Sequence, residues 1–128
     1  MSELLRLRGL PSVDAVTAVP LSKKRLLERG FNQSMLLGKH IAARSGAELL
    51  PHAILKVKET RPQAGLNRKE RTRNLRGAFL AGDCVSGKAV LLVDDVITTG
   101  ATVGECAKAL ARAGAKEVFV AALARTKK

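Results

Sequence analysis

AVLLVDDVITTGAT, residues 89–102, joins a continuous apolar run to a pair of aspartates and a turn of small residues. The apolar run at 89–93 is typical of a strand that is covered on both faces. Residues 102–113 then repeat apolar side chains at helical spacing as far as Gly114, a residue that favours a helix end, and residues 118–123 form another apolar run. A strand, a helix and a strand within about 35 residues predict a βαβ unit with parallel strands and a right-handed crossover.

The residues before this unit continue the alternation of strands and helices. The β-branched run at 13–19 predicts a buried strand that ends before Pro20. Asn32 can cap a helix over 33–43, and Ser45-Gly46 can end it. Short strands are expected at 53–57 and 77–80. Residues 58–76 show no period of either kind, so we expect a flexible basic loop there.

These elements predict an α/β fold with a mostly parallel central sheet flanked by helices. The chain has 128 residues, of which 46% are hydrophobic, and this suits a single domain over residues 1–128 whose core needs no metal or disulfide. Residues 1–12 are expected to form an N-terminal extension. Cys84 and Cys106 lack metal-ligand spacing, and we expect both to be buried. No apolar run reaches the length of a signal peptide or a membrane span, so we expect a cytoplasmic protein without a membrane partner.

The charge of the chain indicates an anionic partner. The net charge is +12, from 23 Lys and Arg against 11 Asp and Glu. Residues 56–76 hold eight positive and two negative side chains, and residues 20–33 hold four positive and one negative. Together these two segments carry +9 of the +12. Residues 56–76 could instead form a solubilising loop, and the basic residues within 20–33 could instead form a solvated turn.

The aspartate pair and the turn after it predict a sugar phosphate site. Ligands of open parallel sheets bind beyond the carboxyl ends of the strands, where Asp94 and Asp95 are expected on a central strand. Ribose hydroxyls or a metal ion could bind these carboxylates. Residues 98–102 then lead into the start of a helix, where free amides and the helix dipole favour a phosphate. Neither a Walker loop nor a Rossmann glycine motif is present, so this is a different kind of phosphate site.

Residues 90–102 resemble the phosphoribosyl pyrophosphate (PRPP) signature of type I phosphoribosyltransferases, over thirteen contiguous positions. The segments 19–21, 29–33, 71–74 and 78–79 are similar to the ComF branch of that superfamily. The resemblance covers residues 13–125 and implies the type I fold with a reduced hood. Full-length ComF relatives usually begin with a Cys-rich zinc segment that this sequence lacks. We therefore expect either a short member of the family or a sequence that begins after this segment.

The resemblance also implies the roles of individual residues. Asp94 and Asp95 would hold the ribose hydroxyls together with Mg²⁺, which is bound mainly through PRPP, and Asp94, Asp95 and Thr98 form the catalytic set. A phosphoribosyl group would pass to a nitrogen acceptor with release of pyrophosphate. The 5-phosphate would be bound by Thr98, Thr99, Gly100, Ala101 and Thr102. The pyrophosphate would be bound by Lys23, Lys24, Arg25 and Arg29. The flexible loop that closes over the site would contribute Gln63, Arg71 and Asn74.

Two classes of function remain open. The first is an enzyme whose acceptor the sequence does not identify, although Thr98 stands where several purine-salvage members have a carboxylate, which disfavours a purine. The second is a non-catalytic ComF-like accessory factor in DNA uptake that binds PRPP or single-stranded DNA. The three phenylalanines are the only aromatic residues, so platforms for base stacking are nearly absent. Competence proteins and a second copy of this chain, in a homodimer, are further candidate partners.

Overall fold

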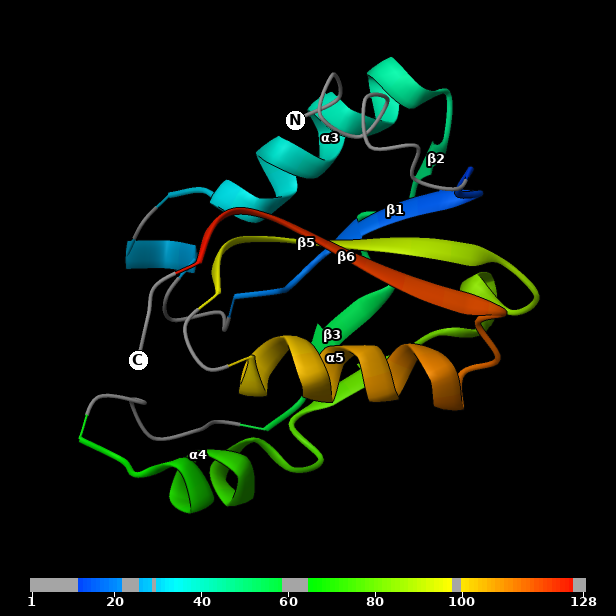
Figure 1. The fold of residues 1–128 in the computed structure, drawn as a ribbon. Coiled ribbons are helices and arrows are strands. Elements are labelled where there is room, and N and C mark those ends of the chain that lie inside the picture. Colours follow the sequence, from blue (N-terminus) through cyan, green and yellow to red (C-terminus); the bar gives the residue numbers. More distant parts are fainter. Residues whose placement is uncertain (1–11, 22–25, 29, 59–64, 98–99, 126–128) are drawn as a thin grey trace.

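The computed structural model describes residues 12–21, 26–28, 30–58, 65–97 and 100–125. A four-stranded sheet runs through its centre in the order β2-β1-β5-β6, and every neighbouring pair in it is parallel. Figure 1 shows this sheet between two helices, α3 and α5. The bounds are β1 Ala15–Ala18, α3 Gln33–Ser45, β2 Glu48–Leu49, β5 Ala89–Ile97, α5 Ala101–Arg112 and β6 Glu117–Arg125. The predicted α/β class and the parallel β5-α5-β6 unit are confirmed.

Alternation along β5 explains why the sheet is covered on both faces. Val90 and Leu92 pack with α5 residues in one buried cluster, whereas Leu91 and Val93 pack with Ile41 of α3 in another. Successive side chains of a strand point to opposite faces, so a strand that is apolar at every position needs a helix on each side. The core therefore consists of two layers of side chains, one on each side of the sheet, as expected for a sheet flanked by helices.

The predicted caps of α3 are confirmed, and the helix extends two residues past the expected end at 43. The Asn32 side chain accepts a hydrogen bond from the Met35 amide at 3.2 Å, which satisfies one of the free donors of the first turn. At the other end Gly46 adopts a left-handed conformation with φ 78°, and its amide donates to the Ala42 carbonyl.

The expectation of an irregular loop over 58–76 is wrong for its second half, which forms α4 at Arg68–Leu75. Asn67 and Glu70 form a reciprocal capping box: the Asn67 side chain accepts from the Glu70 amide at 2.8 Å, and the Glu70 side chain accepts from the Asn67 amide at 3.2 Å. Leu75 is buried in the core at the end of this helix. Periodicity missed α4 because only one of its eight residues is apolar. Residues 59–64 lie outside the described residues.

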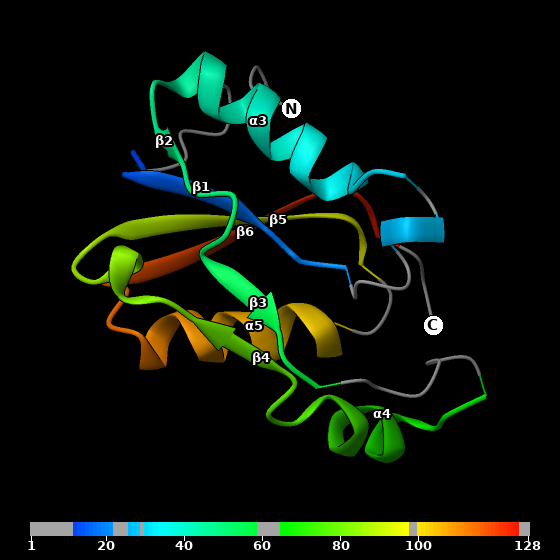
Figure 2. The ribbon, with the colours of Figure 1, turned by 180° about the vertical axis from the view of Figure 1, so that it is seen from behind.

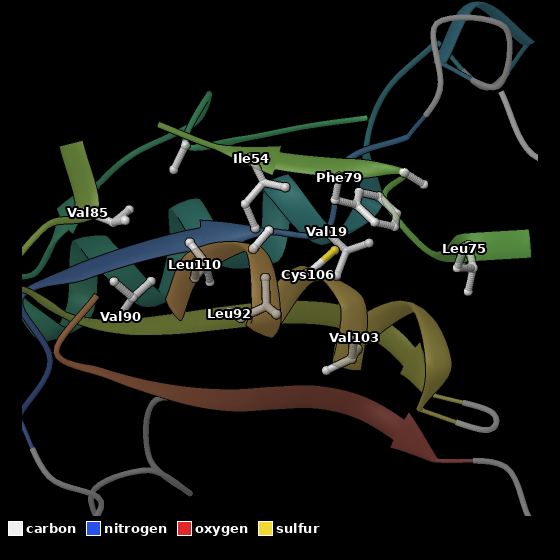
Figure 3. Packing of buried hydrophobic residues seen from close by; sticks show 13 residues of the cluster. Val19, Ile54, Leu75, Phe79, Val85, Val90, Leu92, Val103, Cys106 and Leu110 are labelled. Carbon is white, nitrogen blue, oxygen red and sulfur yellow. The ribbon is translucent and has the colours of Figure 1, made fainter. Parts of the chain in front are cut away.

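The expected strands near 53–57 and 77–80 form a separate antiparallel pair, β3 Ile54–Lys56 and β4 Phe79–Ala81. Both strands contact α5, and they lie beside this helix, in front of it in Figure 2. Ile54 and Phe79 point into the same cluster as Cys106 and Leu110 of α5 (Figure 3). The buried face of α5 therefore packs against both the central sheet and this two-stranded sheet.

The two cysteines have different environments. Cys106 is fully buried on α5, as expected. Cys84 is exposed, so the expectation that it is buried is wrong. It lies on the 3-10 helix η1, Asp83–Val85, which turns Val85 into the core and leaves its neighbour outside. Across the part of the chain described above, no helix combines the length and the apolar character needed to cross a membrane.

Candidate functional site

The aspartate pair lies on β5, which is an interior strand as predicted. The strand is longer than the apolar run suggested, because β6 continues to pair with it up to Ile97. Strand β1 pairs only as far as Val93, and Asp94 is already opposite Ala122 of β6. The two aspartates therefore lie on the part of β5 that still pairs with β6 but no longer pairs with β1.

The start of α5 supplies the second half of the site. Gly100 is the N-cap in a left-handed conformation with φ 85°, no side chain caps the helix there, and the Gly100 carbonyl accepts from the Gly104 amide at 2.8 Å. Figure 1 shows that the first turn of α5 lies at the edge of the sheet where β5 ends. Ala101 and Thr102 lie in this first turn and are half-buried. A helix start of this kind favours an anion.

Ser34 of α3 connects the two aspartates. Its hydroxyl donates to Asp94 Oδ1 at 3.3 Å and accepts from the Asp95 amide at 3.1 Å. The Asp95 amide also donates to Asp94 Oδ1 at 2.9 Å. Ser34 is buried, with 5% of its surface exposed. The sequence analysis did not identify Ser34, because only the fold brings it to positions 60 residues further along the chain.

The carboxyl group of Asp94 is difficult to ionise in this environment. The pKa of Asp94 is raised from 3.8 to about 6. The largest cause is burial, followed by the hydrogen bond to the Asp95 side chain and the charge of Asp95. The hydrogen bonds from the Asp95 amide and Ser34 act in the opposite direction and lower the pKa. Two carboxylates held together in a partly dry site attract a cation or hydroxyl donors, because either would relieve their repulsion.

This pKa predicts a pH-dependent effect of Asp94→Asn. The pKa is higher in the folded than in the unfolded chain, so Asp94 contributes stability that is present below about pH 4 and lost as the pH rises through about 6. Asparagine lacks this titration. The variant should match the wild type near pH 4 and exceed it near pH 8 by on the order of 1 kcal/mol, allowing for solvent screening. Urea unfolding of both proteins from pH 4 to 8 measures the difference, and parallel curves would contradict it.

The conformation of Gly100 predicts opposite effects for two glycine substitutions in the same turn. Gly100→Ala places a side chain at φ 85° and should lower the free energy of unfolding by about 1 kcal/mol. Gly104 is helical and has open space around the position of a Cβ atom, so Gly104→Ala should raise it by about 0.5–1 kcal/mol. Urea unfolding of both variants tests this. Equal effects of the two substitutions would show that the left-handed turn is not required.

The remaining predicted site residues are placed only in part. Residues Arg71 and Asn74 lie on α4, which packs against α5. The structure thus puts them on a helix and not on an irregular loop. The others lie outside the described residues: Lys23, Lys24, Arg25, Arg29, Gln63, Thr98 and Thr99.

The described residues also bear on metal binding and on nucleophilic chemistry. Nowhere in the described ranges do three or more His, Cys, Asp or Glu side chains gather as a metal site. Two carboxylates are hard oxygen donors of the kind Mg²⁺ prefers, and they suit an ion that takes its other ligands from a bound substrate.

Burial, followed by the charges of Asp94 and Glu105, raises the pKa of Cys106 to about 12. This thiol therefore stays protonated and is a core residue.

Comparison with known proteins identifies the class of this domain. The phosphoribosyl transferase domain family matches residues 34–128, and the chain belongs to this family. The B. subtilis glutamine PRPP amidotransferase, in complex with ADP and GMP, has the same fold with a TM-score of 0.64 and 25% identity over 95% of this chain and 25% of that one. PRPP synthetase from Mycobacterium smegmatis, with a TM-score of 0.56 and 22% identity over 97% of this chain and 33% of that one, supports the fold alone.

Its relatives among curated proteins include DNA utilization proteins and competence proteins. It is 43% identical to the DNA utilization protein YhgH of Salmonella typhi over 94% of this chain and 53% of the relative. It is 37% identical to competence protein F of Haemophilus influenzae over 94% of this chain and 54% of the relative, and 36% identical to ComFC of Streptococcus pneumoniae over 84% and 46%. The chain spans about half the length of these relatives. The resemblance to the ComF branch is confirmed.

Proposed function

We propose that the domain binds PRPP at the end of β5 and transfers its phosphoribosyl group to a nitrogen acceptor. Asp94 and Asp95 accept hydrogen bonds from the ribose hydroxyls. The start of α5, from Gly100 to Thr102, binds the 5-phosphate together with Thr98 and Thr99. The observation that carries the proposal is the pairing of two half-buried carboxylates with a helix start that has no side-chain cap, at one edge of the sheet.

Charge supports this ligand over a neutral sugar. PRPP carries a pyrophosphate and a phosphate, and the segments at 20–33 and 56–76 hold +9 of the net charge of +12. The basic residues Lys23, Lys24, Arg25 and Arg29 are proposed to bind the pyrophosphate. Gln63, Arg71 and Asn74 are proposed to belong to a segment that closes over it and excludes water.

The two carboxylates fit a Mg²⁺ ion that is bound mainly through the oxygens of PRPP. When bound, this ion neutralises the charge that develops on the departing pyrophosphate. The chain's own task is to orient the ribose and to hold the phosphates apart. The bond between C1 and the pyrophosphate oxygen breaks with its electron pair leaving on oxygen, the acceptor nitrogen forms the new bond to C1, and that nitrogen loses a proton. No protein nucleophile is needed for this displacement.

The test is pyrophosphate release from PRPP and Mg²⁺ in the presence of a panel of nucleobases and amines. Release that depends on one acceptor class would support the transferase and identify the acceptor. PRPP binding by calorimetry without release for any acceptor would support binding alone. Absence of both would sink the proposal.

A second function, an accessory role in DNA uptake, is favoured by the relatives' names and by the charge. In this case the basic segments bind single-stranded DNA through its phosphates, and the affinity falls steeply as salt rises. Titration of a fluorescent oligonucleotide at several salt concentrations, with and without PRPP, separates the two functions. Competition by PRPP would place both ligands on the same residues, whereas DNA binding that ignores PRPP would favour a separate role.

A further inference from the structure

Strand β1 stops pairing with β5 just before the aspartate pair. The Val93 carbonyl accepts from the Val19 amide at 2.9 Å, which is the last bond on the β1 side. Backbone groups of a strand point to alternate sides, so the Asp95 amide faces the same side as Val93, two residues after β1 has stopped pairing. A buried amide without an acceptor would cost about 1–3 kcal/mol.

Ser34 fills this position from another element. Its hydroxyl accepts from the Asp95 amide and donates to Asp94 Oδ1, so a single oxygen atom contacts the backbone of one aspartate and the side chain of the other. The hydroxyl is not needed to begin α3, because Asn32 already caps this helix. Asn32 also donates to the Val19 carbonyl at 3.2 Å, which fixes the start of α3 against the end of β1.

We infer that Ser34 is a positioning residue for the site: its hydroxyl holds the Asp94 carboxylate and the Asp95 backbone in the orientation that receives the ribose hydroxyls. The inference rests on the proposed function for the identity of the ligand. Its geometric part, the orientation of the aspartate pair by a residue of α3, stands on the contacts alone. The same contact links the pair to the helix that follows the basic segment at 20–31 in the sequence.

The matched control lies on the same helix. Ser45 is in the last turn of α3, where its hydroxyl accepts from the Ala47 amide at 3.3 Å, and it is exposed. Ser34→Ala and Ser45→Ala remove the same atom from opposite ends of α3, and each removes a bond to a backbone amide. Only the first should affect the aspartate pair. Ser34→Thr retains the hydroxyl and should restore what Ser34→Ala loses.

The experiment measures Mg²⁺-PRPP affinity by calorimetry and hydrogen exchange of the Asp95 amide by NMR, using the full chain. Ser34→Ala should weaken binding about tenfold, equivalent to about 1.4 kcal/mol. It should also accelerate exchange of the Asp95 amide about tenfold, because one of its two acceptors is gone. Ser34→Thr should bind within about threefold of the wild type, and Ser45→Ala should match the wild type in both measurements.

The two arms separate failure of the inference from failure of the proposed function. Unchanged exchange of the Asp95 amide in Ser34→Ala would overturn the positioning role, whatever the affinity. A wild type that binds no PRPP would overturn the proposed function, and accelerated amide exchange in Ser34→Ala would then still support the positioning of the aspartate pair. If the extra methyl group lowers the melting temperature of Ser34→Thr, the comparison of Ser34→Ala with Ser45→Ala decides whether Ser34 positions the aspartate pair.

Discussion

Replacement of Asp94 and Asp95 by asparagine is expected to weaken binding of Mg²⁺-PRPP at least about hundredfold. Each carboxylate would lose a charge-assisted hydrogen bond to the ribose, worth about 1.5–3 kcal/mol, and the site would lose its attraction for the metal. The fold should persist, because asparagine fills the same volume and burial disfavours the ionised form of Asp94. Calorimetry gives the affinity, and urea unfolding confirms that the variant is folded.

Asp14→Asn is the control for this double variant. Asp14 lies at the opposite end of β5, where its side chain accepts from the Ala89 amide at 2.8 Å. The substitution removes a carboxylate that also bonds to this strand, but at the edge away from α5's first turn. It should leave PRPP affinity within about twofold of the wild type. Equal loss in both proteins, or unchanged affinity in the double variant, would refute the assignment of the site.

Leu110→Ala is expected to lower the free energy of unfolding by about 3 kcal/mol. Leu110 is fully buried on α5, in the cluster that this helix shares with β5 and with the β3–β4 pair (Figure 3). Truncation removes apolar surface from both contacts and leaves a cavity that neither β5 nor the β3–β4 pair can fill without moving. Urea unfolding measures the effect, which would be a large part of the 5–15 kcal/mol typical of a domain.

Leu36→Ala provides the comparison, because it removes the same atoms from a helix at a position that is 53% exposed. The cost there should stay below about 1 kcal/mol, since little apolar area returns to water. A similar loss for the two leucines would mean that Leu110 is not packed in a core shared by α5 and the two sheets.

Local signals in the sequence were sufficient for most elements. The apolar run of β5, the periodicity of α5 and the caps at Asn32 and Gly46 depend on neighbouring residues, and each was confirmed. Helix α4 was missed because its signal is a capping box, Asn67 with Glu70, in a segment with almost no apolar residues. The predicted burial of Cys84 was wrong, because the exposure of this residue depends on which side of one short 3-10 helix faces the core.

Taken alone, the sequence determined the α/β class, the βαβ unit at the end of the chain and the placement of the aspartate pair just before a helix start. These features follow from spacing along the chain and from the rule that ligands bind at the carboxyl ends of parallel strands. Only the tertiary structure decided that β5 runs past the aspartates, that Ser34 meets them, and that the pKa of Asp94 is raised. The reason is physical: strand pairing, burial and a hydrogen bond over 60 residues depend on which segments meet in space.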